Sequence, residues 1–192
     1  MQREEAWALV NEYTTQPHLI RHMLAVEAAM RSYAERFGED VELWGLAGLL
    51  HDFDYEQNPD VSIEGHPIVG SRILQELGYP DEVVRAMLSH AAEITSVEPE
   101  SKLEKTLVAV DEMTGFLVAV ALVRPSKSIL DVELKSVRKK WKTKEFAAPV
   151  NRAEVEHAAS EIGMSLDDHI LVVLDAMKGC AAELGLERQE AA

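Results

Sequence analysis

The chain has a single cysteine, Cys180, among its 192 residues. One thiol excludes an intramolecular disulfide and a thiolate zinc site, so histidine and carboxylate groups would have to hold any metal. Long apolar runs are also absent, because the longest one, 116–123, is far shorter than the roughly 20 residues that cross a bilayer. Arg3, Glu4 and Glu5 lie where a secretory signal would need apolar residues. We therefore expect a soluble, cytoplasmic protein with no membrane partner.

Basic residues are scarce, since 19 lysines and arginines face 34 aspartates and glutamates, for a formal net charge of -15. Such an excess of negative charge repels backbone phosphates, which excludes nucleic acid as a partner of the whole molecule. The segment 124–144 differs, because its eight basic residues outnumber two acidic ones and give a local net charge of +6. This segment is either a solvated helical face or a rim that attracts a phosphorylated small molecule.

No segment shows the alternating pattern of a strand, whereas apolar residues recur at helical spacing along the chain. The pattern predicts an all-α helical bundle that forms a single domain over 1–192, with a core at about 18–122 and a helical extension at about 125–186. Loops are expected at 53–65 and 95–101, Asp81 is a predicted helix cap, and the tail 187–192 is expected to fray. The predicted helices cover 3–13, 18–37, 41–51, 66–78, 82–92, 102–123, 129–141, 152–162 and 166–184.

Histidine and aspartate residues stand at the ends or on the inner faces of five of these predicted helices. An apolar helix rarely carries such groups without a partner, because a buried charge or an unsatisfied imidazole is costly. Together they offer the mixed nitrogen and oxygen ligand set of a divalent metal, which indicates an enzyme. In chain order they are His22, the adjacent pair His51 and Asp52, and then His66, His90 and Asp111.

The order and local contexts of these residues resemble the HD-domain superfamily of metal-dependent phosphohydrolases. The resemblance covers about 18–122. The remaining C-terminal third is similar to bacterial HDIG-type hydrolases only in the general character of its sequence. Phe53 and Asp54 stand where that motif has Ile-Gly, a departure that spares the ligands. The matching contexts are Leu49-Leu50-His51-Asp52, Gly65-His66-Pro67 and Val110-Asp111-Glu112.

The resemblance implies that one metal is held by four residues, His22, His51, Asp52 and Asp111. It also implies that Asp52 bridges to a second metal held by His66 and His90. Two cations about 3.5 to 4 Å apart can activate a bridging water and stabilise phosphoryl oxygens. Imidazole with carboxylate favours Fe or Mn, while Zn, Co, Ni and Mg stay open. The predicted catalytic residues are Asp52 and Asp54, the latter as an orienting group or a proton acceptor, with loop capping as the alternative.

Three residues are predicted to contact the substrate, namely His18, Arg72 and Lys127. His18 precedes His22 by four residues and shares its helix face, as a substrate-side neighbour or a capping residue. A guanidinium or ammonium group suits phosphate, although a plain surface charge explains Arg72 and Lys127 equally well. Arg21 is a weaker candidate, because the residue next to His22 points elsewhere on the helix.

The leading hypothesis is a phosphohydrolase in which metal-activated water attacks the phosphorus of a nucleotide or a similar small phosphoester. Two alternatives stay open. A carboxylate-bridged di-iron form of the same ligands could activate O2, as an oxygenase does. A non-catalytic binding module could anchor a phosphorylated ligand, although such modules usually accompany an output domain. His157 and His169 fall outside the motif order, and Cys180 is expected to be an inert buried thiol.

Overall fold

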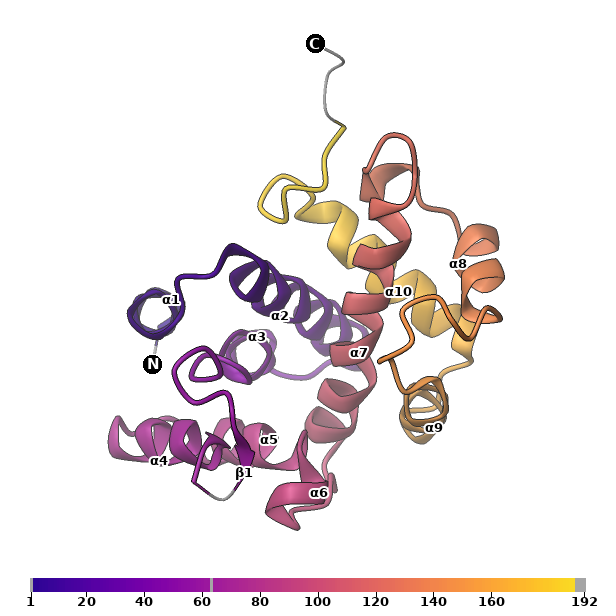
Figure 1. Ribbon diagram of the computed structural model, residues 1–192. Helices are drawn as coiled ribbons and strands as arrows, with labels where there is room; N and C mark the ends of the chain where they lie inside the picture. Colours follow the sequence, from indigo (N-terminus) through magenta and orange to yellow (C-terminus); the bar gives the residue numbers. More distant parts are fainter. Residues whose placement is uncertain (1, 63, 189–192) are drawn as a thin grey trace.

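The computed structural model describes residues 2–62 and 64–188, so residues 189–192 of the expected tail lie outside the described part. The fold is all-α, as the sequence predicts, with one pairing of two very short strands (Figure 1). In chain order its elements are α1 (Arg3–Tyr13), α2 (Pro17–Phe37), α3 (Val41–Leu50), β1 (Val61–Ser62), β2 (His66–Pro67), α4 (Ile68–Glu76), α5 (Asp81–Ser89), α6 (Ala92–Thr95), α7 (Lys102–Leu122), the 3-10 helix η1 (Ile129–Asp131), α8 (Leu134–Trp141), α9 (Arg152–Glu161) and α10 (Leu166–Gly179).

The two longest helices, α2 and α7, form the centre of the bundle (Figure 1). Helix α3 packs on α2, α5 packs on α3 and α7, and α10 packs on both α2 and α7. Apolar side chains from Ala6 to Leu186 form one connected core. The C-terminal helices therefore share a core with the helices that carry the predicted ligands. None of the described helices is long and apolar enough to cross a membrane.

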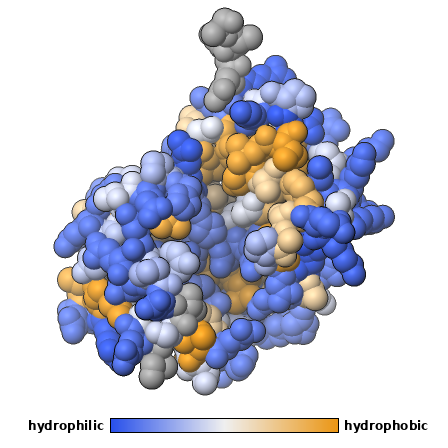
Figure 2. Space-filling model, in the orientation of Figure 1, coloured by the Kyte–Doolittle hydropathy of each residue, from blue (hydrophilic) through white to orange (hydrophobic). Residues whose placement is uncertain are grey.

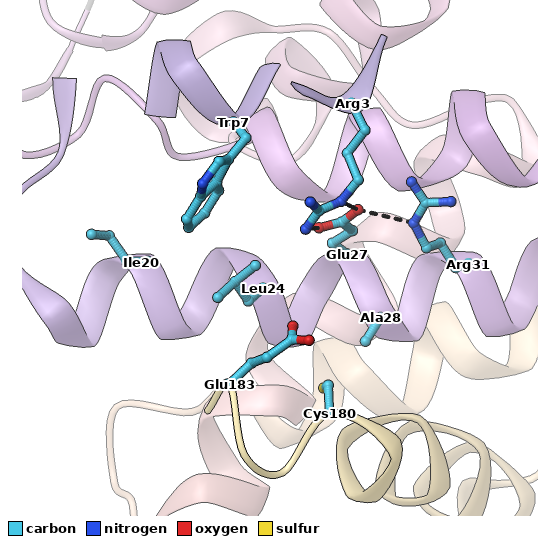
Figure 3. Close-up of a pocket in the computed structure, with 9 residues that line it drawn as sticks. All are labelled: Arg3, Trp7, Ile20, Leu24, Glu27, Ala28, Arg31, Cys180 and Glu183. Atoms are coloured by element: carbon cyan, nitrogen blue, oxygen red, sulfur yellow. Dashed lines mark hydrogen bonds and ion pairs between the residues drawn. The ribbon is translucent and has the colours of Figure 1, made fainter. Parts of the chain in front are cut away.

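Helix α1 is held on α2 by a buried carboxylate, that of Glu27, which is 4% exposed. Arg3 donates to it from Nε and Nη2 at 2.6 and 2.8 Å, and Arg31 donates from Nε at 2.9 Å (Figure 3). Two paired guanidinium groups offset the cost of burying this charge. The network borders a cavity of about 690 Å³ that none of the predicted metal ligands lines. The network ties α1 to α2, while the packing of α1 in the bundle is against α3.

Both helices predicted between residues 66 and 95 are present as α4 and α5, but their bounds differ from the prediction. Helix α4 begins at Ile68 and not at residue 66, because His66 pairs with Val61 in the two-stranded element. Asp81 is the first residue of α5 and not its cap, since Pro80 holds the extended backbone that precedes the helix. The predicted loop at 95–101 starts late, because the short helix α6 occupies the first part of the connection.

Two C-terminal helices are also shorter than predicted. The stretch 129–141 is divided because Val132 and Glu133 are extended, and Val132 is completely buried at that bend. Helix α10 ends at Gly179, where the backbone of Cys180 leaves helical geometry, and turns follow up to Gly185. The Cys180 thiol is half-buried, and burial raises its pKa to about 11, so little reactive thiolate forms near neutral pH.

His169 connects α10 to the two central helices. The hydroxyl of Tyr33 on α2 donates to its Nδ1 at 2.6 Å, and its Nε2 donates to the carbonyl of Ala109 on α7 at 2.8 Å. The ring is fully buried, and burial lowers the pKa of His169 to about 4. A neutral imidazole of the extension therefore holds α7 two residues before Asp111.

Acid should weaken this connection. An unfolded imidazole titrates near pH 6.5, whereas the folded ring stays neutral down to about pH 4. The unfolded chain thus binds more protons between these values, and stability falls as the pH drops through that window. We expect the titration of His169 to lower the free energy of unfolding of the wild type by up to about 3 kcal/mol between pH 6.5 and 4. His169→Gln, which does not titrate, should lose less over the same interval in denaturant titrations of metal-free protein. Equal losses in both proteins would contradict the assignment.

Candidate metal centre

All six predicted metal ligands converge in the interior of the bundle. Helices end there or pass through, so that residues from distant parts of the chain meet at one point. His51 and His90 are the C-cap residues of α3 and α5. Asp52 directly follows His51, and His66 is the first residue of β2. His22 lies within α2, and Asp111 lies within α7.

A first group of ligand atoms surrounds the Nε2 atom of His22. This atom lies 3.2 Å from Nε2 of His51, 2.9 Å from Oδ1 of Asp111 and 3.7 Å from Oδ2 of Asp52. Nε2 of His51 lies 3.5 Å from the same Asp52 oxygen. Two imidazole nitrogens and two carboxylate oxygens therefore face one point, a donor set suited to a divalent transition metal.

A second group uses the other oxygen of Asp52. The Nε2 atoms of His66 and His90 lie 3.2 Å apart, and they are 3.2 and 3.4 Å from Oδ1 of Asp52. Each of the two groups contains three residues whose ligand atoms all lie within 4.8 Å of one another. Asp52 thus presents one oxygen to each group, which is the arrangement of a carboxylate that bridges two cations.

Local backbone geometry orients two of the imidazoles. Nδ1 of His51 donates to the carbonyl of Gly48 at 2.8 Å, and Nδ1 of His90 donates to the carbonyl of Met87. The last carbonyls of a helix have no partner within it, so a C-cap histidine can turn back to the carbonyl three residues earlier. Because the proton stays on Nδ1, the lone pair of Nε2 faces the cluster.

Asp54 lies fully buried behind His66. Its Oδ1 accepts from Nδ1 of His66 at 2.7 Å, and its Oδ2 accepts from the backbone N–H of Gly70 at 2.8 Å. A Cβ on Gly70 would lie 2.6 Å from the Asp54 carboxyl and 2.2 Å from the Met87 methyl group, so only glycine allows this approach. No spacing rule in the sequence marks Gly70 as part of the site.

Gly70→Ala should loosen the second group while it leaves the first intact. The added methyl group must displace Asp54, and His66 then loses the partner that orients it. Groups behind a metal ligand are worth roughly 10- to 100-fold in metal affinity. We expect a loss of this size for one of two metal-binding events in calorimetric titrations, with the other unchanged. Gly179→Ala is the matched control, because a Cβ there meets no atom within 4 Å. Identical titrations for both variants would refute the role of Gly70.

The cluster is open on one side. The side chains of His51, His66 and His90 are 0%, 4% and 8% exposed, whereas those of Asp52 and Asp111 are 19% and 24% exposed. The His22 side chain is 24% exposed as well. The two carboxylates and His22 therefore line the side from which a substrate can approach.

The carboxylates raise the proton affinity of the buried imidazoles. Burial lowers the pKa of His51, but the charges of Asp52 and Asp111 outweigh it and raise the pKa to about 9. The same balance, with Asp52 and Asp54 as the anions, raises the pKa of His66 to about 9. Burial opposes ionisation of Asp52 and Asp111, yet the neighbouring imidazoles hold the pKa of each carboxyl well below its usual range. The cluster therefore attracts cations.

The three predicted substrate contacts lie in different places. His18 is exposed and lines a cavity beside His22, together with Arg21. Arg72 and Lys127 are exposed and line neither this cavity nor the one beside His90. His18 and Arg21 thus lie on a cavity that the predicted ligand His22 also lines, whereas Arg72 and Lys127 do not line it.

Comparison with known proteins agrees with this geometry. The family model described as HD domain matches residues 19–114, which is half of the chain. The chain belongs to the HD-domain family. The HD-domain match supports the superfamily of metal-dependent phosphohydrolases, and the two His and Asp groups are positioned to hold divalent metal.

The HD-domain region is also similar to part of several curated proteins. The ribonuclease Y of Desulfotalea psychrophila is 32% identical over 99 residues, which cover 51% of this chain and 18% of that protein. The ribonuclease Y of Rhodopirellula baltica is 33% identical over 89 residues, which cover 46% and 17%. The chain thus spans less than a fifth of the length of these relatives. No solved structure matches the chain.

Proposed function

We propose that this HD-domain protein hydrolyses a small phosphoester with water activated at two divalent cations. The observation that carries the proposal is the position of Asp52, whose Oδ2 faces His22 and His51 while its Oδ1 faces His66 and His90. When bound, two such cations supply an activated water and stabilise the phosphoryl oxygens. Each group has two imidazole nitrogens, which favours Fe or Mn over Mg.

The residues of the chain have separate tasks in this proposal. Asp111 completes the first group, and the partly exposed carboxylates of Asp52 and Asp111 leave room for the phosphoryl group at the open side. Asp54 is a positioning residue and not a proton acceptor, because both of its oxygens are already bonded to His66 and Gly70. Arg21 and His18 provide donors for phosphate oxygens beside the first group.

A small substrate fits the charge of the molecule. The relatives carry the name ribonuclease, which denotes cleavage of a polymer. A net charge of -15 opposes the approach of a long polyanion, whereas it is a minor obstacle for one phosphate group that reaches metal ions. We therefore propose a nucleotide or a similar small phosphoester as the substrate.

Metal removal tests the proposed function directly. Protein treated with a chelator should lose hydrolysis of nucleoside monophosphates and p-nitrophenyl phosphate, and added Mn should restore it. Turnover that survives complete metal removal would refute the mechanism. The assay should also run without oxygen, because hydrolysis needs none while an oxygenase reaction does. Activity found only in the presence of oxygen would favour the oxygenase alternative.

A further inference from the structure

A cavity of about 280 Å³ extends from His22 between the first turns of α2 and the second half of α7. Asp111, Gly115, Val118 and Leu122 follow one another on α7 at spacings of four, three and four residues. This spacing places them on one face of the helix. A metal ligand and the wall of the cavity therefore share a face, so a molecule whose phosphoryl group is at the ligands can extend along α7 into the cavity.

Apart from His18, Arg21, His22 and Thr114, the residues that line this cavity are apolar. Val118 and Leu122 line it from α7, and Leu184 and Leu186 line it from the turns that follow α10. Figure 2 shows an apolar area over this end of α7, where Leu122 is 50% exposed. Apolar walls with few polar groups are typical of small-molecule pockets, which occupy about 300 to 1,000 Å³. The volume of this cavity lies just below that range, so the cavity suits a single ring or a short chain.

Gly115 leaves this space free. A glycine inside a helix is less favourable than alanine by roughly 1 kcal/mol. Close packing does not explain it, because a Cβ on Gly115 would meet no atom within 4 Å. Since Gly115 lines the cavity, a larger side chain at this position would occupy the cavity itself.

A second cavity, of about 560 Å³, lies beside His90 and has the opposite character. Its one lysine, Lys105, is paired with Glu161 at 2.9 Å. The carboxylates that remain repel further phosphate groups of a substrate. Its acidic lining residues are Glu93, Glu98, Glu112, Glu154 and Glu161.

We propose that the cavity beside His22 binds an apolar group, such as an aromatic ring, of the phosphorylated substrate, and that Gly115 sets specificity by keeping it open. The inference rests on the proposed function and narrows its substrate to a phosphate ester with one small apolar substituent, in place of a polyphosphate. The acidic cavity beside His90 disfavours additional phosphates, while the apolar cavity accepts the substituent.

Binding of two phosphonates to Mn-loaded protein tests this inference without turnover. Phenylphosphonate and methylphosphonate carry the same anionic group, and neither has an ester bond to cleave. We expect the wild type to bind phenylphosphonate at least tenfold more tightly in calorimetric titrations. Gly115→Leu should abolish this preference by filling the cavity. Leu122→Glu, which places a charge on the wall at an exposed position, should abolish it as well. Gly179→Leu is the control and should keep it, since a Cβ there meets no atom within 4 Å.

Metal content and thermal unfolding of each variant separate a filled cavity from a damaged fold. A wild type without the preference, or a Gly115→Leu protein that keeps it at normal metal content, would overturn the inference. Failure of the proposed function is a different result. If the wild type shows the preference and Gly115→Leu lacks it, the cavity assignment holds even where no phosphoester is hydrolysed.

Discussion

Replacing Asp52 with alanine is expected to remove both metals and to abolish turnover. Asp52 is the residue that both groups share. Its Oδ2 lies 3.5 Å from Nε2 of His51 in the first group, and its Oδ1 lies 3.2 Å from Nε2 of His66 in the second. Groups that merely orient a ligand are worth roughly 10- to 100-fold in affinity, so loss of a shared ligand should exceed about a thousandfold. Elemental analysis of purified protein and phosphoesterase assays measure the two effects.

Asp175→Ala serves as the control for this experiment, because Asp175 is an exposed carboxylate on α10 that belongs to neither group. It should retain the metal content and activity of the wild type.

Variants of single histidines distinguish the two metal-binding groups. His90→Ala should lose only the second metal, and His22→Ala should weaken the first. An Asp52→Ala protein that still carries two ions per chain would contradict the bridging role.

Lowering the pH from 8 to 6 is expected to weaken metal binding about a hundredfold in each group. His51 and His66 have pKa values of about 9 in the metal-free protein. Both imidazoles are therefore in the cationic form, with a proton on each ring nitrogen, throughout this range. A metal must displace that proton, and its apparent affinity therefore falls about tenfold for each unit of pH below the pKa. Competition with a chelator of known affinity, at several pH values, measures the slope.

The slope above pH 7 is the decisive part of that experiment. An ordinary imidazole, with a pKa near 6.5, is already neutral there and would give almost no dependence on pH. The raised pKa values extend the dependence to pH 8 and above. Titration in buffers of different ionisation enthalpy should also show about one proton released per metal. An affinity that stays constant between pH 7 and 8 would contradict the strong coupling of the imidazoles to Asp52 and Asp111.

Helices whose ends depend on local signals were predictable from the sequence. The bounds of α1 agree with the prediction, and those of α2, α3 and α7 agree within one residue, because apolar spacing, Gly38 and Asp40 act locally. Helices whose ends depend on distant contacts were not. His66 pairs with Val61 and is therefore not part of α4. Val132 is extended and buried in the core, which divides the helix predicted over 129–141.

The same distinction applies to the site. The types and order of the ligands can be read from the sequence, since each ligand stands on or next to a helix with a buried apolar face. The groups that orient them cannot, because Gly70 reaches Asp54 only after α4 has packed in place. The sequence also does not show that the Arg21 guanidinium lies next to Gly185, which is distant from it along the chain. His169, outside the motif order, is one of the links between α10 and α7.

The wall that Leu184 and Leu186 contribute lies outside the matched region, residues 19–114. In the proposed function, the residues that perform the chemistry and some of those that select the substrate are therefore encoded in separate parts of the gene. Substitution of Leu184 or Leu186 would change the wall of the cavity without removing a metal ligand, although both side chains belong to the core that the ligand-bearing helices share. In the proposed function, the choice of substrate can thus change through residues that are not among the His and Asp ligands.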